Sequence, residues 1–261
     1  MADSAMFDST MFDLTGKVAI VTGSSKGIGR AIAEAMARAG AKVVISSRKA
    51  EACEEVAAPL RKEGREVAVI PCHIGKRADC EALVAKTNDR FGTVDVLVCN
   101  AAVNPYYGPL NGLTDEAFDK VMQTNVRSNL WLANLVRPDM AAKGNGAIII
   151  VSSIGGLKGT DKLGIYAISK AADFQLARNL AIECGPDNIR VNCIAPGLVR
   201  TDFAKALWDN PETLRQTESR TPLRRIGEPD DIAGAAVFLA SRAGSWMTGQ
   251  TIVIDGGVTI A

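Results

Sequence analysis

The sequence predicts a single α/β domain, built on a doubly wound parallel sheet of seven strands. Three observations favour this fold class. Short apolar runs alternate with longer amphipathic stretches along almost the whole chain of 261 residues, a pattern typical of a parallel sheet covered by helices on both faces. No linker or low-complexity segment divides the chain. A glycine-rich turn follows the first apolar run, which is where such folds bind nucleotides.

The short apolar runs define the predicted strands and the amphipathic stretches define the helices. The strands are expected at residues 17–21, 42–46, 67–71, 94–98, 147–151, 190–194 and 251–254. The helices are expected at residues 27–39, 50–63, 77–91, 115–142, 164–184 and 229–241. The long helix at 115–142 contains Pro138, where we expect an interruption because proline cannot continue the backbone ladder.

Two segments stand outside this alternation. Residues 1–13 are predicted to be a flexible N-terminal tail, so the single domain spans residues 14–261. Residues 201–227 form the one long irregular stretch in the predicted fold. Because a long insertion late in such a fold often closes over a ligand, we expect a lid at about 200–227.

Charge and composition exclude several function classes. Lys and Arg number 30 and Asp and Glu number 29, so no bulk charge favours nucleic acid or an anionic membrane. Apolar runs such as 147–151 are far too short for a membrane span. The N-terminus lacks the basic residues of a signal peptide. Six cysteines without a Cys-x-x-Cys pair, and one histidine, predict reduced thiols, no metal site and a cytoplasmic protein.

The glycine-rich turn has the spacing G-x-x-x-G-x-G, formed by Gly23, Gly27 and Gly29. Glycine permits a tight turn and lets the start of the following helix approach a pyrophosphate. The helix N-terminus then offers free N–H groups and positive potential to the phosphates. An ordinary strand–helix turn is the alternative interpretation. We expect cofactor contacts from Gly23, Ser25, Lys26, Gly27, Ile28 and Gly29.

The end of the second predicted strand indicates which dinucleotide binds. Sites for NAD place an acidic residue there to hold the ribose 2′-hydroxyl. Here the chain reads Ser47-Arg48-Lys49, with no acid before Glu51. Arg48 can bind a 2′-phosphate through its fork of N–H groups, and Lys26 can add a second cation. These residues therefore predict a preference for NADP(H) over NAD(H), unless both cations are merely solvated.

Tyr166 and Lys170 are four residues apart, which places them on one face of the helix predicted at 164–184. A tyrosine is a poor base at neutral pH, but a nearby ammonium lowers its pKa. Ser153 follows the fifth strand and reaches the same carboxyl edge of the sheet. The spacing is also compatible with a solvent-facing Tyr and Lys.

Together these residues resemble the short-chain dehydrogenase/reductase superfamily over about residues 12–258. Ser153 precedes Tyr166 by thirteen residues, and Lys170 follows it by four. Further matching segments are Asn100-Ala101-Ala102, Thr124-Asn125-Val126, Asn192, Pro196-Gly197 with Thr201, and Asp255-Gly256-Gly257. Segments 72–76 and 100–108 are most similar to the NADPH-dependent carbonyl and retinal reductase branch.

The resemblance implies a Rossmann fold and a role for each catalytic residue. Tyr166 would be the proton donor in reduction, and Lys170 would hold the nicotinamide ribose and lower the pKa of Tyr166. Ser153 would polarise the carbonyl, and Asn125 would anchor a water that links Lys170 to solvent. The remaining expected cofactor contacts are Ile74, Asn100, Ala101, Ala102, Pro196, Gly197, Val199 and Thr201.

Two residues depart from the family pattern. Ala102 replaces a glycine, and His73 stands where many members have an aspartate that contacts adenine. We interpret His73 as a loop residue with no catalytic role, and its contact with adenine stays open.

The sequence therefore predicts an NADP(H)-dependent oxidoreductase that acts on a hydrophobic ketone or aldehyde, or on a secondary alcohol. A 3-oxoacyl-thioester reductase is an alternative, for which Arg220, Arg224 and Arg225 could bind an acyl carrier. A nucleotide-binding sensor without turnover is a further one. The family's usual helix pairing implies a homotetramer. Besides Ser153, the expected substrate contacts are Tyr106, Gly155, Leu157, Leu198, Phe203, Leu207 and Trp208.

Overall fold

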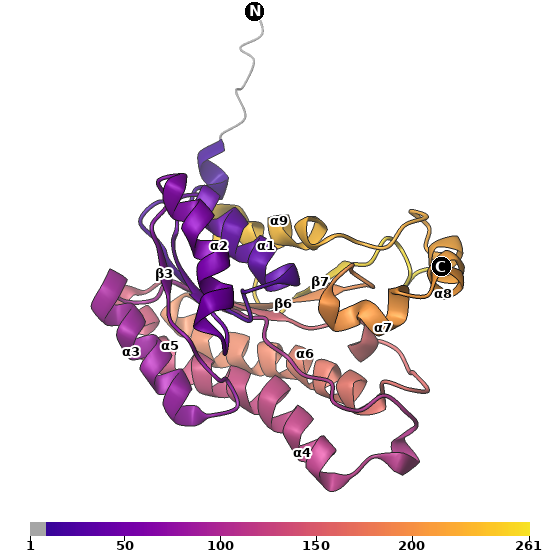
Figure 1. The fold of residues 1–261 in the computed structure, drawn as a ribbon. Coiled ribbons are helices and arrows are strands. Elements are labelled where there is room, and N and C mark those ends of the chain that lie inside the picture. The colour runs from indigo at the N-terminus through magenta and orange to yellow at the C-terminus, as the bar shows by residue number, and fades with distance from the viewer. Residues whose placement is uncertain (1–8) are drawn as a thin grey trace, which may run out of the picture.

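The computed structural model describes residues 9–261, and in these residues seven strands form one parallel sheet (Figure 1). The strand order is β3-β2-β1-β4-β5-β6-β7, so the order reverses beside β1. The strands are β1 Val18–Thr22, β2 Lys42–Ser46, β3 Val67–Val69, β4 Val96–Cys99, β5 Gly146–Val151, β6 Ile189–Pro196 and β7 Thr251–Ile254. This architecture confirms the predicted doubly wound Rossmann-type fold.

Helices cover both faces of the sheet, and each face has its own apolar core (Figure 1). The core of one face is formed with α1 Gly27–Arg38, α2 Ala50–Lys62 and α9 Pro229–Ala240. The core of the other is formed with α3 Arg77–Phe91, α5 Ser128–Lys143 and α6 Gly164–Cys184. The central strands β1, β4 and β5 are buried along their whole length, which explains why they read as unbroken apolar runs.

The long helix predicted at 115–142 is interrupted, but not near Pro138. The chain forms α4 Asp115–Met122, a π-helical turn at Gln123–Arg127, and then α5, which contains Pro138 in its interior. At the start of α5, the side chains of Ser128 and Asn129 donate to the carbonyl oxygens of Thr124 and Asn125 in the turn, at 2.6 Å each. These bonds satisfy backbone groups that a regular ladder would pair differently. The predicted position of the break was therefore wrong.

Residues 201–227 are more regular than predicted. They contain a 3-10 turn at Asp202–Ala204, then α7 Lys205–Trp208 and α8 Pro211–Arg220. Asn210 caps α8 by accepting hydrogen bonds from the N–H groups of Glu212 and Thr213, and Pro211 occupies its first turn. Whether this segment closes over a ligand stays a prediction.

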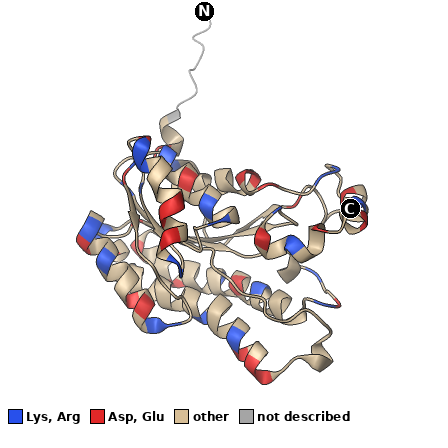
Figure 2. Ribbon diagram, viewed as in Figure 1, with Lys and Arg blue, Asp and Glu red and all other residues tan. Residues whose placement is uncertain are grey.

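Three features of the described residues bear on the remaining expectations. Ser9–Phe12 of the predicted tail form a 3-10 turn, whereas residues 1–8 of that tail lie outside the described part. In residues 9–261 no helix is both long and apolar enough to cross a membrane. Basic and acidic residues are interspersed over the helices seen in Figure 2.

Candidate active site

A cavity of about 280 Å³ lies at the carboxyl edge of the sheet, beside the reversal of strand order. Open parallel sheets bind ligands at this position. Fifteen of the predicted cofactor residues line it: Gly23, Ser25, Lys26, Gly27, Ile28, Gly29, Ser47, Arg48, Ile74, Asn100, Ala101, Ala102, Tyr166, Lys170 and Thr201. The other four, Lys49, Pro196, Gly197 and Val199, lie outside its lining.

The glycine turn is fixed by Asn100, which follows β4. Its side-chain Nδ2 donates to the carbonyl oxygens of Thr22 at 2.9 Å and Gly23 at 3.2 Å. Gly23 adopts a φ of 66°, in the left-handed region that favours glycine. A Cβ on Gly29 would lie 2.3 Å from Asn100 Nδ2 and 2.5 Å from Gly23 O. The turn therefore needs glycine at both positions.

The start of α1 faces the cavity, and its first backbone N–H groups have no partner among residues 9–261. Among the described residues no side chain caps this helix, whose N-cap is Lys26. Its first N–H groups, together with the helix dipole, suit the phosphates of a dinucleotide.

The cations expected to hold a 2′-phosphate differ in their surroundings. Arg48 is exposed at the end of β2 and lines the cavity. Lys26 instead pairs with Asp202, with Nζ 3.1 Å from Oδ2, and both side chains are largely exposed. An exposed pair of this kind contributes little free energy, so a bound phosphate can compete for Lys26.

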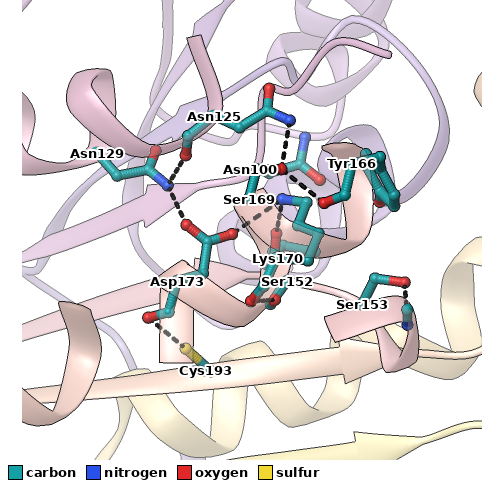
Figure 3. A network of polar contacts seen from close by, with 12 residues as sticks. Asn100, Asn125, Asn129, Ser152, Ser153, Tyr166, Ser169, Lys170, Asp173 and Cys193 are labelled. Carbon is teal, nitrogen blue, oxygen red and sulfur yellow. Dashed lines mark hydrogen bonds and ion pairs between the residues drawn. The ribbon is translucent and has the colours of Figure 1, made fainter. Parts of the chain in front are cut away.

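Tyr166 and Lys170 lie one turn apart near the start of α6, as their spacing predicts (Figure 3). The Lys170 ammonium lies 5.7 Å from the centre of the Tyr166 ring. Lys170 Nζ donates to the carbonyl oxygen of Val151 at 3.0 Å and to Asp173 Oδ2 at 3.1 Å. Ser153, two residues beyond β5, accepts a hydrogen bond from the N–H of Gly155 at 3.0 Å.

Asn125 lies in the π-helical turn with its amide fully engaged. Its Nδ2 donates to Val103 O and to Ser169 Oγ, and its Oδ1 accepts from Val103 N, at 2.9 to 3.0 Å. Asn125 is buried and does not line the cavity. The π-helical turn thus ties the loop after β4 to α6.

Sequence reasoning missed Asp173, which is completely buried one turn beyond Lys170. Burial raises the pKa of its carboxyl, while Lys170 and Asn129 act to lower it. Burial alone would lower the pKa of Lys170, but the charges of Asp173 and Tyr166 outweigh it and raise that pKa. The available signal was a carboxylate three residues after the lysine on the face of α6 that also carries buried Phe174 and Ala177.

The predicted substrate residues do not share one cavity. Phe203 lines the first cavity with its ring centre 5.9 Å from that of Tyr166. Leu198 lines a second cavity of about 310 Å³ next to α8. Leu157 is exposed, while Tyr106 and Trp208 donate hydrogen bonds to the backbone oxygens of Pro109 and Thr201. Gly155 lies beside Ser153, and Leu207 lies on α7.

A dinucleotide turn that shares a cavity with a phenol and an ammonium defines a class: oxidoreductases built on the Rossmann fold. A family model described as "Enoyl-(Acyl carrier protein) reductase" matches residues 23–259. Dehydrogenase/reductase SDR family member 4 of Sus scrofa is 44% identical over 244 residues, which cover 94% of this chain and 88% of the relative. The chain therefore belongs to the short-chain dehydrogenase/reductase (SDR) family.

Solved structures agree with this assignment. A gluconate 5-dehydrogenase from Burkholderia cenocepacia, in complex with NADP and tartrate, superposes with a TM-score of 0.92 at 32% identity and covers 97% of this chain and 98% of its own. A 7α-hydroxysteroid dehydrogenase, complexed with NADH and 7-oxo glycochenodeoxycholic acid, has a TM-score of 0.93 at 38% identity, with the same coverage. These two structures hold different nicotinamide cofactors and different small molecules within one fold.

Proposed function

We propose that this SDR oxidoreductase transfers a hydride between NADP(H) and a hydrophobic ketone or aldehyde, or the corresponding secondary alcohol. The observation that carries the proposal is that Tyr166 and Lys170 line the same cavity as the glycine turn. The relatives named as dehydrogenase/reductases support the same class of reaction.

The cavity fits a nicotinamide dinucleotide on three observations. A glycine cradle at Gly23 and Gly29 leaves no room for a Cβ. The N-terminus of α1 is uncapped among the described residues. Thr124 Oγ1 is buried without a partner in the described part of the chain, and its residue lines the cavity. The turn would hold the pyrophosphate, Lys170 the nicotinamide ribose, and Arg48 with Lys26 a 2′-phosphate.

The bound cofactor supplies or accepts the hydride, and the protein controls the proton. In reduction, the Tyr166 hydroxyl donates its proton to the carbonyl oxygen of the substrate. Ser153 Oγ donates a hydrogen bond to the same oxygen and orients it. The positive charge of Lys170 stabilises the phenolate that Tyr166 leaves behind. In oxidation the phenolate takes the proton from the alcohol.

Apolar surroundings favour a hydrophobic substrate. The ring of Phe203 lies beside Tyr166, where it can cover the reacting carbonyl and exclude water. The second cavity adds Ile154, Leu198 and Val199, and its lining also includes the charged residues Lys158, Arg225, Asp231 and Asp255. The six cysteines, which all lie in the described part, are free and buried, and this supports the proposed cytoplasmic location.

The acyl-carrier alternative has weaker support. Arg225 is paired with Asp231, and Arg224 donates to the backbone oxygen of Ser219. Two of the three arginines expected to bind an acyl carrier are thus engaged within the chain itself.

Absorbance assays test the proposal in both directions: with NADPH, a homologous series of ketones and aldehydes and a 3-oxoacyl thioester are offered for reduction, and with NADP⁺, the matching secondary alcohols and a sugar acid such as gluconate are offered for oxidation. We expect kcat/KM to rise along the ketone series, by about 0.8 kcal/mol per buried methylene until the pocket is full. A preference for the thioester would favour the acyl reductase. A preference for the sugar acid would contradict the apolar site, and binding of NADPH without any turnover would favour the sensor.

A further inference from the structure

Asp173 is a charged residue in the core to which the proposed reaction gives no role. Its carboxylate is completely buried, and both of its oxygens accept hydrogen bonds from side chains. Oδ2 accepts from Lys170 Nζ at 3.1 Å and Oδ1 accepts from Asn129 Nδ2 at 3.0 Å. Asn129 Nδ2 also donates to the backbone oxygen of Asn125, so a continuous chain of contacts runs from the π-helical turn to Lys170 (Figure 3).

These contacts determine which N–H donor of the Lys170 ammonium is left to bind a ligand. An ammonium carries three N–H donors. One is given to Val151 O and one to Asp173, and the third has no partner among the described residues. Because Lys170 lines the cavity, the third donor is the one available to a ribose hydroxyl. Without Asp173, the flexible side chain of a lysine would lose one of its two fixed points.

The charge of Asp173 also acts on Tyr166 through Lys170. A buried cation next to a phenol lowers the pKa of the phenol, and a buried anion next to that cation offsets part of this effect. The Tyr166–Lys170 pair therefore loses its first proton at a pH that depends on Asp173, whichever member carries that proton.

The other groups that face the Tyr166–Lys170 pair are uncharged, so they do not offset the charge of this pair. The titratable neighbours are Cys99 on β4 and Cys193 on β6, and burial raises the pKa of both thiols, which keeps them neutral. The remaining polar neighbours, Asn129 on α5 and Ser152 after β5, are uncharged.

We propose that Asp173 is a positioning residue for this oxidoreductase: its carboxylate fixes the Lys170 ammonium toward the ribose site and sets the pH at which Tyr166 becomes a base. The inference rests on the roles given above to Tyr166 and Lys170. Asp173 would be a third ionisable group beside Tyr166 and Lys170, and it does not touch the substrate.

The test is a pH titration of the near-ultraviolet phenolate absorbance in wild type, Asp173→Asn and Asp173→Ser. Each protein is measured with and without Tyr166→Phe, so that the difference reports Tyr166 apart from Tyr106 and Tyr107. Loss of one negative charge should move the Tyr166 midpoint by about one pH unit, a tenfold change in proton affinity. The midpoint falls where Lys170 keeps its proton, and it rises where burial makes Lys170 lose its proton first. The serine variant serves if the asparagine variant does not fold, as judged by circular dichroism.

The matched control is Asp95→Asn. Asp95 is also a buried carboxylate bonded to a lysine, with Oδ1 3.0 Å from Lys143 Nζ, but it precedes β4 at the opposite edge of the sheet. This variant should lower stability and leave the Tyr166 midpoint in place.

The possible failures are distinguishable. A midpoint that stays in place in a folded Asp173 variant overturns the role of Asp173. If that happens while Tyr166→Phe abolishes turnover, the proposed function stands. If Tyr166→Phe retains turnover in the otherwise wild-type protein, the proposed function itself fails.

Discussion

Arg48 is the residue on which the choice of cofactor depends most. It follows Ser46 and Ser47 at the end of β2, where an enzyme selective for NAD would carry an acid. Its guanidinium is exposed and borders the cavity, whereas Lys26 is shared with Asp202. The sequence predicted a phosphate-binding role for both cations. It could not predict the ion pair between Lys26 and Asp202, because these residues lie 176 positions apart in the chain.

We therefore expect kcat/KM to favour NADPH over NADH by about 2–4 kcal/mol. Arg48→Asp should remove most of this preference, because it replaces a phosphate ligand by a charge that repels phosphate. Lys62→Asp, the same kind of charge change at the far end of α2, is the control and should leave the preference intact. Steady-state kinetics with both cofactors give the answer, and equal efficiency of the wild type with NADH and NADPH would refute the assignment.

At the scale of elements, the hydrophobic periodicity of a segment predicted those helices and strands whose position it determines. The central strands and α1, α3 and α6 lie close to their predicted positions, because period and burial are encoded within each segment. The π-helical turn could not be predicted, since it depends on Asn125 bonding to Val103 and Ser169 from distant segments. For α8 a signal was present, the Asn210-Pro211 pair that begins the helix, yet the segment was interpreted as irregular.

The junction of β1 and α1 gives the sharpest test at this scale. Gly29→Ala should raise the Kd for NADPH at least about tenfold, since the new methyl would displace Asn100 from Thr22 O and Gly23 O and distort the phosphate site. Gly234→Ala is the matched control, because Gly234 also lies in a helix and its Cβ would meet open space. Fluorescence titration with NADPH measures the Kd of both variants. Equal Kd values for the two variants would mean that the turn does not hold the phosphates.

At the scale of the whole molecule, large apolar side chains remain on the surface of the single chain. Leu130 on α5, Ile182 on α6 and Trp246 before β7 are exposed to 38%, 78% and 101%. Exposed apolar groups suit a symmetric assembly, and Leu130 and Ile182 lie on the helices through which a tetramer is expected to form. The sequence predicted that Leu130 lies in such a helix, but only the fold shows that its side chain is exposed.

We expect a homotetramer with four times the chain mass of 27.6 kDa at micromolar concentration. Leu130→Asp, which would bury a charge in the expected interface, should reduce the assembly to a smaller species. Light scattering coupled to size exclusion measures both masses. A wild-type mass equal to that of one chain would exclude the tetramer.

The site as a whole was predicted in part. Spacing along one helix was enough to pair Tyr166 with Lys170, and the strand ends brought the glycine turn to the same edge. The substrate residues were harder to predict, because Leu198 and Leu157 come from loops and Trp208 from the short helix α7, and the directions of these segments depend on tertiary packing. Asp173 was missed, because the sequence does not show that this acid is buried beside Lys170.

The account rests on Tyr166 as the proton donor, and one measurement tests this most directly: kcat and the Kd for NADPH in Tyr166→Phe. The change removes only the hydroxyl, so kcat should fall at least about 100-fold while the Kd stays nearly unchanged. Tyr107→Phe, the same change at an exposed ring, should keep wild-type kcat. If Tyr166→Phe retained more than a tenth of wild-type kcat, a loss below about 1.4 kcal/mol, Tyr166 would not be the acid.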